Sequence, residues 1–156
     1  MNGPPNEIYV LQWAHHHLAL GRRTHVMGVL NVTPDSFSDG GRFFSWERAV
    51  EQGLRMAGEG ADILDVGGES TRPYATEVSE HEELDRVIPV IESLRSELDL
   101  PISIDTLKAG VAREALRAGA SLVNDVSALR LDPELAQVAA EAEVPVVLMH
   151  MKGTPR

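Results

Sequence analysis

The chain has 156 residues, 43% of them hydrophobic, which suits one globular domain or one part of a larger domain. Its formal net charge of −10 and its pI near 5.0 argue against binding to the phosphate backbone of a nucleic acid. The absence of cysteine excludes disulfides and thiolate zinc sites. The first residues do not show a basic stretch followed by a long apolar run, as a secretion signal would. No apolar run in the sequence reaches the about 18 residues of a membrane span. We therefore expect a cytoplasmic protein that does not bind membranes.

Five short apolar runs recur along the chain, and each is typical of a parallel strand that is covered on both faces. They span residues 24–30, 63–66, 102–104, 122–123 and 146–149. Helix-like stretches separate them and cover residues 45–58, 79–98, 108–118 and 132–142. The clearest helix begins at Ser79, which forms a capping-box pattern with Glu82. The alternation predicts a βα repeat, with residues 1–23 as an amino-terminal extension and residues 24–156 as part of one domain.

Polar side chains follow the apolar runs directly. They include Asn31, Asp65, Asp105, the Asn124–Asp125 pair and His150. In a (β/α)8 barrel the carboxyl ends of the strands meet at one rim, where the chemistry is done. A doubly wound open sheet is the alternative, but its usual GxGxxG phosphate loop is absent from the sequence. We predict an α/β protein of the TIM-barrel class, of which a complete barrel needs about 250 residues, so only about the first five βα units are expected in this chain.

Two loops at the predicted rim carry candidate functional residues. The first, residues 31–43, is rich in turn-forming residues and contains Asp35 and Phe37, a composition typical of an active-site loop. The second, residues 67–79, combines two glycines with Ser70, Thr71 and Arg72, and the arginine can hold an anion through a forked pair of hydrogen bonds. Ordinary connecting loops remain the alternative for both. Asp62 and the acidic stretch 77–85 are expected to be solvated surface.

Asp105 and Asn124 are candidates for recognition of a heterocycle. A carboxylate at the end of a buried strand needs a partner, either an arginine or a ligand edge with two donors in line. An asparagine amide both donates and accepts, so it complements the mixed edge of such a ring. A capping aspartate and a turn asparagine are equally compatible with these two positions when they are considered alone.

Five motifs together carry a resemblance to a known family: MGVLNVTPDSFSDGGRF, GADILDVGGESTRP, PISIDT, SLVNDVSAL and VVLMHMKGTP. In this order and spacing they resemble dihydropteroate synthases across nearly the whole chain from Thr24. The resemblance implies a TIM barrel that condenses 6-hydroxymethyl-7,8-dihydropterin pyrophosphate with p-aminobenzoate in folate biosynthesis and releases pyrophosphate. It also implies bound Mg²⁺, a homodimer, and competition by sulfonamides for the p-aminobenzoate pocket.

The resemblance also implies roles for individual residues. Asn31 matches the position associated with the metal, and Asp105 and Asn124 match the positions that contact the pterin. The remaining expected site residues are Thr71, Ser70, Arg72 and Pro73 in the second loop, Asp35 and Phe37 in the first, and Met149 beside the pterin. The predicted reaction is a dissociative displacement in which Arg72 stabilises the leaving pyrophosphate and Asp35 stabilises the developing cation.

The sequence departs from the family pattern in two respects. Tyr74 stands where the family often has glycine after STRP. The aspartate, lysine and arginine that the family's last three strands supply have no matching positions within these 156 residues. Two alternatives to a synthase therefore stay open: a module that binds pterin or methyl-tetrahydrofolate without synthase activity, and an inactive truncated fragment.

Overall fold

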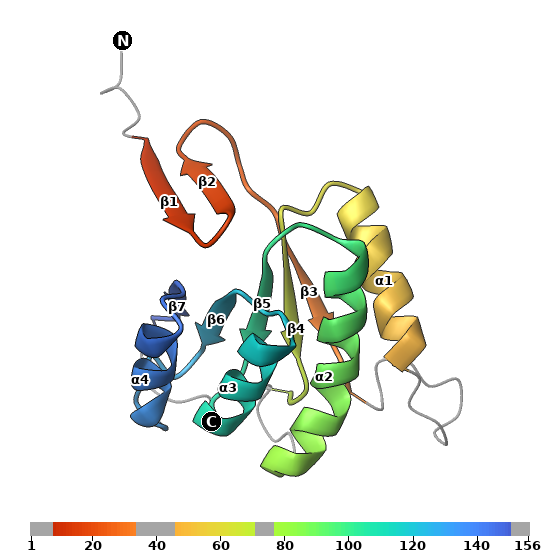
Figure 1. The fold of residues 1–156 in the computed structure, drawn as a ribbon, viewed down its shortest axis with the longest axis vertical. Coiled ribbons are helices and arrows are strands. Elements are labelled where there is room, and N and C mark those ends of the chain that lie inside the picture. The colour runs from red at the N-terminus through yellow and green to blue at the C-terminus, as the bar shows by residue number, and fades with distance from the viewer. Residues whose placement is uncertain (1–7, 34–45, 71–76, 151–156) are drawn as a thin grey trace.

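The computed structural model describes residues 8–33, 46–70 and 77–150, and its elements alternate along the chain after a short hairpin (Figure 1). The elements are β1 (Tyr9–Trp13), β2 (His16–Leu20), β3 (Met27–Asn31), α1 (Trp46–Gly58), β4 (Ile63–Gly67), α2 (Glu80–Glu97), β5 (Ile102–Asp105), α3 (Ala109–Ala118), β6 (Leu122–Asp125), α4 (Glu134–Glu141) and β7 (Val146–Leu148). Within these ranges we find no helix with the length and apolar character needed to cross a membrane. The predicted βα repeat is confirmed, and the ends of the elements differ from the prediction by a few residues.

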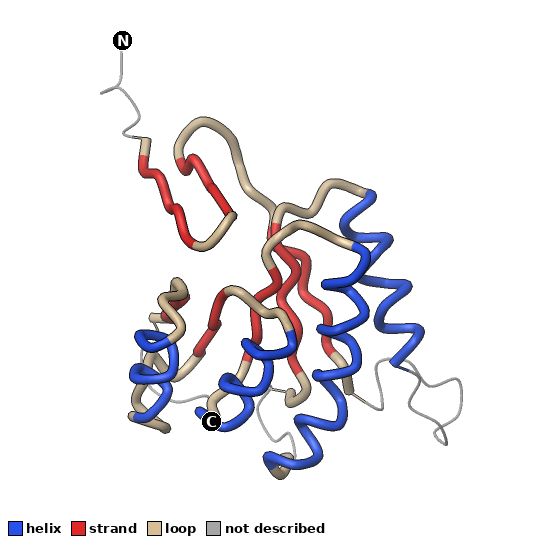
Figure 2. Tube along the Cα trace, viewed as in Figure 1, coloured by secondary structure: helices blue, strands red, loops and turns tan. Residues whose placement is uncertain are grey.

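The five strands β3 to β7 form one parallel sheet whose spatial order follows the chain order. Crossovers between parallel strands are almost always right-handed, so a sheet that grows in one direction receives all its helices on the same face. Figures 1 and 2 show α1 to α4 ranged along that face. A doubly wound sheet would instead reverse its strand order and carry helices on both faces. The observed order is that of consecutive units in a barrel wall.

Local signals in the sequence account for the ends of the helices. The Ser79 hydroxyl accepts a hydrogen bond from the backbone N–H of Glu82 at 3.2 Å, so the predicted amino-terminal cap of α2 is confirmed. Helix α3 ends at Gly119, whose φ of 117° lies in the region that favours glycine. Asp132 accepts from the backbone N–H of Glu134 at 3.1 Å and from that of Ala109 at 2.7 Å. It therefore joins the start of α4 to the start of α3.

The main core lies between the sheet and the helices. Alternate residues of each strand point toward the helices, because successive side chains of a strand face opposite ways. On the strands these buried residues include Leu30, Leu64, Val66, Ile104 and Val123, and on the helices they include Val87, Ile91, Leu94, Ala112 and Leu135. Apart from Asp125 at the end of β6, the side chains on this face are apolar, so the other polar strand residues lie on the opposite face of the sheet.

The hairpin of β1 and β2 covers the amino-terminal end of the sheet. Trp13 and Leu18 of the hairpin pack against Ile63 and Leu122, the first residues of β4 and β6. Sequence analysis treated residues 1–23 as an amino-terminal extension and assigned no helix or strand to them. The hairpin was missed because its turn lacks an Asn-Gly or Gly-containing signal: Ala14 adopts the left-handed conformation, with φ of 46°.

Two acidic residues that we expected on a solvated surface are held by basic partners instead. Glu83 has no exposed surface, and its Oε2 atom lies 2.6 Å from Lys108 Nζ. Asp62 forms an ion pair with Arg23 and accepts a hydrogen bond from the backbone N–H of Val26 at 2.9 Å. The hydrogen bond from Arg23 is the main cause that lowers the pKa of Asp62. The expectation of solvated surface was wrong for these two positions, since their partners are distant in sequence.

Candidate functional site

Three candidate residues lie in one row across the face of the sheet that the helices leave uncovered. The strand register places Asn31 beside Gly67, Gly67 beside Asp105, and Asp105 beside Asn124. All of these positions lie at the carboxyl ends of their strands. The row therefore runs along the predicted rim. At Gly67, between Asn31 and Asp105, an added Cβ would lie 3.4 Å from Asp105 Oδ2, so the Asp105 side chain lies against the glycine.

Asp65 lies one step deeper on the same face and supports the row. Its Oδ2 atom accepts a hydrogen bond from Asn124 Nδ2 at 3.0 Å. This bond fixes the orientation of the amide, and Asn124 Oδ1 faces away from it as an acceptor. In the described part of the chain, Asp65 Oδ1 and Ser103 Oγ are buried without a hydrogen bond of normal geometry. Burial raises the pKa of Asp65, and the nearby Ser103 and Asn124 side chains oppose that rise.

Asp105 is the most strongly perturbed group of the row. Burial, together with the negative charges of Asp65, Glu83 and Asp125, raises its pKa to about 7. The charged form is therefore poorly compensated in the protein alone. A ligand that presents two N–H donors to this carboxylate would supply the missing compensation.

Asp125 belongs to the scaffold of the rim, although it follows Asn124 directly. Its side chain is buried and accepts hydrogen bonds from the backbone N–H groups of Ser127 and Leu129, both at 2.7 Å. Ala128 and Leu129 adopt positive φ values of 54° and 62°. The carboxylate thus stabilises a tight turn after β6 that holds Asn124 in place. The sequence placed Asp125 among the polar rim residues, and only the structure separates its role from that of its neighbour.

The other predicted site residues differ in how the structure places them. Ser70 is half-buried just after β4. Met149 follows β7 and is 39% exposed, with its backbone N–H 3.4 Å from the Asp125 carbonyl oxygen. The predicted site residues Asp35, Phe37, Thr71, Arg72 and Pro73, like Tyr74, lie outside the described residues.

Sequence reasoning missed a partly buried ion cluster next to the site. Lys108 Nζ lies 2.5 Å from Glu69 Oε2 and 2.6 Å from Glu83 Oε2. Burial opposes the charge on Lys108, but its hydrogen bonds to Glu69 and Glu83 outweigh that effect and raise its pKa. The only local signal is a lysine three residues after Asp105, and its partners lie 39 and 25 residues away.

The described residues offer Asn31 as the one predicted metal ligand. Ranges 8–33, 46–70 and 77–150 contain no group of three or more histidine, cysteine, aspartate or glutamate side chains that could hold a metal ion. Mg²⁺ is usually held by one or two protein oxygens together with substrate phosphates and water, and not by a cage of protein ligands. Asn31 is exposed at the rim, so its side-chain oxygen is suited to this kind of Mg²⁺ coordination.

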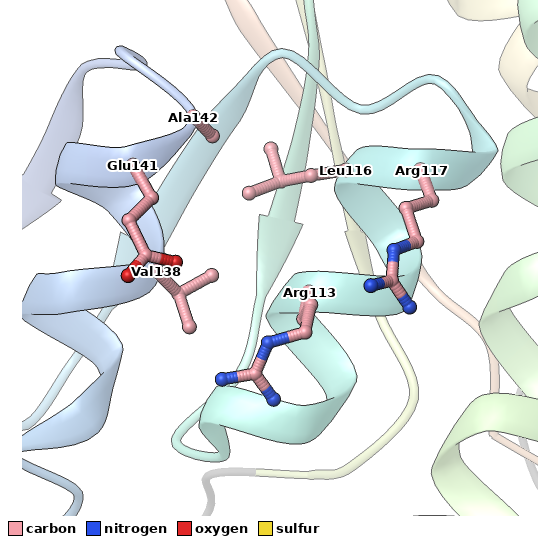
Figure 3. Close-up of a pocket in the computed structure, with 6 residues that line it drawn as sticks. All are labelled: Arg113, Leu116, Arg117, Val138, Glu141 and Ala142. Atoms are coloured by element: carbon pink, nitrogen blue, oxygen red, sulfur yellow. The ribbon is translucent and has the colours of Figure 1, made fainter.

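A shallow pocket of about 340 Å³ lies on the opposite side of the sheet from these residues, between α3 and α4 (Figure 3). Its lining is Arg113, Leu116, Arg117, Val138, Glu141 and Ala142. Both helices pack on the apolar face of the sheet, so this pocket is separated from Asp65, Asp105 and Asn124 by the sheet itself. We assign it no part in the site.

The fold and the row of residues define an α/β protein of the barrel-wall type with an acidic, hydrogen-bonding rim suited to a polar heterocycle. The chain belongs to the family described as pterin binding enzyme, whose family model matches residues 27–156. The family resemblance that we drew from the motifs is therefore confirmed.

Curated relatives agree with this assignment. The chain is 57% identical over 136 residues to a dihydropteroate synthase of Synechocystis sp., and the match covers 87% of this chain and 47% of the relative. It is also 57% identical over 133 residues to a dihydropteroate synthase of Bacillus subtilis, covering 85% and 47%. The chain thus spans about half the length of the curated relatives it matches.

Solved structures show the same fold. A Xanthomonas albilineans dihydropteroate synthase with 4-aminobenzoic acid matches with a TM-score of 0.81 and 58% identity, over 88% of this chain and 50% of that one. A Yersinia pestis dihydropteroate synthase in a sulfonamide drug complex matches with a TM-score of 0.84 and 49% identity, over 95% and 53%. The predicted fold class is confirmed, and the five strands correspond to about half of a dihydropteroate synthase chain.

Proposed function

We propose that this chain carries the pterin-binding part of a dihydropteroate synthase, which joins 6-hydroxymethyl-7,8-dihydropterin pyrophosphate to p-aminobenzoate. The observation that carries the proposal is the adjacent pair Asp105 and Asn124 at the strand ends, with Asp65 behind them. Identities of 57% to dihydropteroate synthases over most of the chain support it.

The row supplies the complement of a pterin edge. The Asp105 carboxylate would accept hydrogen bonds from the exocyclic amino group and the neighbouring ring N–H. Asn124, whose amide is oriented by Asp65, would accept through Oδ1 and could donate its second Nδ2 hydrogen. These two charge-assisted hydrogen bonds would supply the compensation that the buried Asp105 carboxylate lacks in the protein alone.

The pyrophosphate end of the substrate would lie toward Asn31 and the second loop. Asn31 would contribute an oxygen ligand to Mg²⁺, which when bound supplies charge neutralisation for the leaving pyrophosphate. By their motif positions, Ser70, Thr71 and Arg72 would bind the same phosphates. These residues lower the barrier by stabilising negative charge as the carbon–oxygen bond breaks.

The second substrate would enter from the first loop. Phe37, Pro73 and Met149 would bind the ring of p-aminobenzoate and the outer edge of the pterin, and Asp35 would stabilise positive charge at the pterin methylene carbon. The carbon–oxygen bond breaks first and pyrophosphate leaves with the electron pair, and the amine nitrogen then forms a bond to that carbon. The amine then releases its proton to water. The 4-aminobenzoic acid complex of the Xanthomonas albilineans relative supports this choice of second substrate.

Assembly, location and domain extent are further parts of the proposal. A homodimer rests on the family resemblance, and a cytoplasmic location rests on the sequence pattern. Residues 1–23 would form an extension to a barrel portion that comprises residues 24–156. Sedimentation equilibrium of the purified chain and fractionation of the source cells test the first two statements.

Binding and turnover should be measured separately. We expect the chain to bind 6-hydroxymethylpterin, and Asp105→Asn to weaken that binding by about 10- to 100-fold, since a hydrogen bond to a charged group contributes about 1.5–3 kcal/mol. Glu51→Gln, on the exposed side of α1, is the control and should bind as the unmodified chain does. Pyrophosphate release with both substrates and Mg²⁺ then tests the activity of the 156 residues. Pterin binding that is insensitive to Asp105→Asn would contradict the assigned site.

A further inference from the structure

A cluster of three charged residues joins the two ends of the second loop to two helices. We call Glu69, Lys108 and Glu83 the neck cluster. Glu69 lies just after β4, Glu83 lies in the first turn of α2, and Lys108 precedes α3. Lys108 Nζ binds one oxygen of each glutamate, at 2.5 and 2.6 Å. Their side chains are 18%, 21% and 1% exposed for Glu69, Lys108 and Glu83, so solvent screens these interactions only weakly.

Glu69 also bridges the loop itself. Its Oε1 atom accepts a hydrogen bond from the backbone N–H of Val78 at 3.3 Å, and Val78 is buried on the far side of the segment that Glu69 begins. One carboxylate therefore holds both ends of the segment 70–77, while its second oxygen is bound to Lys108. The two ends cannot separate without loss of at least one of these contacts.

Further contacts fix the start of the loop to α2. Arg86 Nη1 donates to the Gly68 carbonyl oxygen at 2.7 Å, and Arg86 also pairs with Glu82. A Cβ atom at Gly68 would lie 2.8 Å from Val87 Cγ1 and 3.2 Å from the Glu83 carbonyl oxygen, so the backbone here touches the helix directly. The start of the loop is thus packed on the same helical turn that carries Glu83.

The backbone at Lys108 is itself well anchored. The Lys108 backbone N–H donates to Thr106 Oγ1 at 3.2 Å, and Thr106 is buried directly after Asp105. The backbone N–H of Ala109, the next residue, donates to Asp132 at 2.7 Å. The cluster therefore links the second loop to the same β5–α3 connection that carries Asp105.

We propose that the neck cluster is a positioning device that holds the ends of segment 70–77, so that Lys108 sets the affinity of the site for the substrate's pyrophosphate group without touching the substrate. This rests on the proposed function, because that segment carries Thr71 and Arg72. One buried and one partly buried carboxylate around one ammonium group make the device sensitive: removal of Lys108 leaves like charges facing each other, and Glu83 Oε1 already has no hydrogen bond among the described residues.

The test compares Lys108→Met with Arg117→Met, which removes a cation from an exposed ion pair with Glu114 on the same helix. Hydrogen exchange of peptides covering residues 68–80 should be faster in Lys108→Met by at least about fivefold, as expected for coupled buried groups. The Kd for inorganic pyrophosphate with Mg²⁺ should rise by a similar factor, while the Kd for 6-hydroxymethylpterin changes less than about twofold. Arg117→Met should change none of the three, and Lys108→Arg should restore most of the loss.

A second variant guards against simple misfolding. Glu69→Ala removes the bridge to Val78 but leaves a neutralised Lys108–Glu83 pair, and it should also accelerate exchange at the loop ends. Unchanged exchange in Glu69→Ala would overturn the proposal, as would an equal loss of pyrophosphate and pterin affinity in Lys108→Met. Should the unmodified chain bind neither ligand, the proposed function fails, and the exchange measurements still decide the role of the neck cluster.

Discussion

The raised pKa of Asp105 predicts an unusual dependence of stability on pH. In the folded chain this carboxyl has a pKa of about 7, against 3.8 for an unperturbed aspartate. The folded state therefore binds the proton more tightly than the unfolded state does, and stability falls as pH rises from about 4 to about 7. Between pH 5 and pH 8 the contribution of Asp105 to the free energy of unfolding should drop by about 2.5 kcal/mol.

Asp105→Asn removes this titration while it keeps the shape of the side chain. The variant should be more stable than the unmodified chain at pH 8, and the difference should shrink by about 2.5 kcal/mol by pH 5 and approach zero only below about pH 4. Urea unfolding at intervals of half a pH unit measures both curves. Glu51→Gln, which neutralises an exposed carboxyl of α1, should give a curve parallel to that of the unmodified chain. Parallel curves for Asp105→Asn and the unmodified chain would refute the reasoning.

Two further substitutions test the surrounding contacts. Asn124→Ala removes the donor to Asp65 Oδ2, so it should lower the free energy of unfolding at pH 8 by about 1–3 kcal/mol in urea, and a change below about 0.5 kcal/mol would show that this bond does not hold the buried carboxylate. Gly119→Ala places a Cβ 2.7 Å from Arg95 Cγ at a φ of 117°, so it should destabilise the chain by at least about 1 kcal/mol. Its control is Gly58→Ala, where no atom lies within 4 Å of the added Cβ, and thermal unfolding that showed the two alike would contradict the strain argument.

The repeat of strands and helices could be predicted because its signals are local. Buried parallel strands appear as apolar runs, and the ends of helices are indicated by capping residues such as Ser79 and terminal glycines such as Gly119. The rim could be predicted for the same reason, since the polar residues follow the apolar runs directly. Asn31, Asp105 and Asn124 lie in one row because consecutive strands pair in parallel. Their proximity therefore follows from the βα repeat alone.

The features that escaped prediction depend on contacts between distant segments. Nothing in the sequence around Glu83 distinguishes it from its solvated acidic neighbours, and only the approach of Lys108 makes its burial tolerable. The turn at Ala14 carries no residue that favours a positive φ, so the packing of Trp13 and Leu18 against the sheet must stabilise the hairpin. Asp125 looked like its neighbour Asn124 until the turn it stabilises became visible.

The placement of charge supports the proposal that the site binds a ligand that donates hydrogen bonds. The strand residues that face away from the helices in β3 to β6 include Asn31, Asp65, Ser103, Asp105 and Asn124, and none of the residues on that face in these four strands is basic. Lys108, which follows Asp105 by three residues, forms ion pairs with two other carboxylates, those of Glu69 and Glu83. The face of the sheet that the helices leave uncovered is therefore rich in hydrogen-bond acceptors that the described residues do not satisfy. A neutral heterocycle edge with an amino group and a ring N–H satisfies them without burying a second charge, which is the chemical character of a pterin.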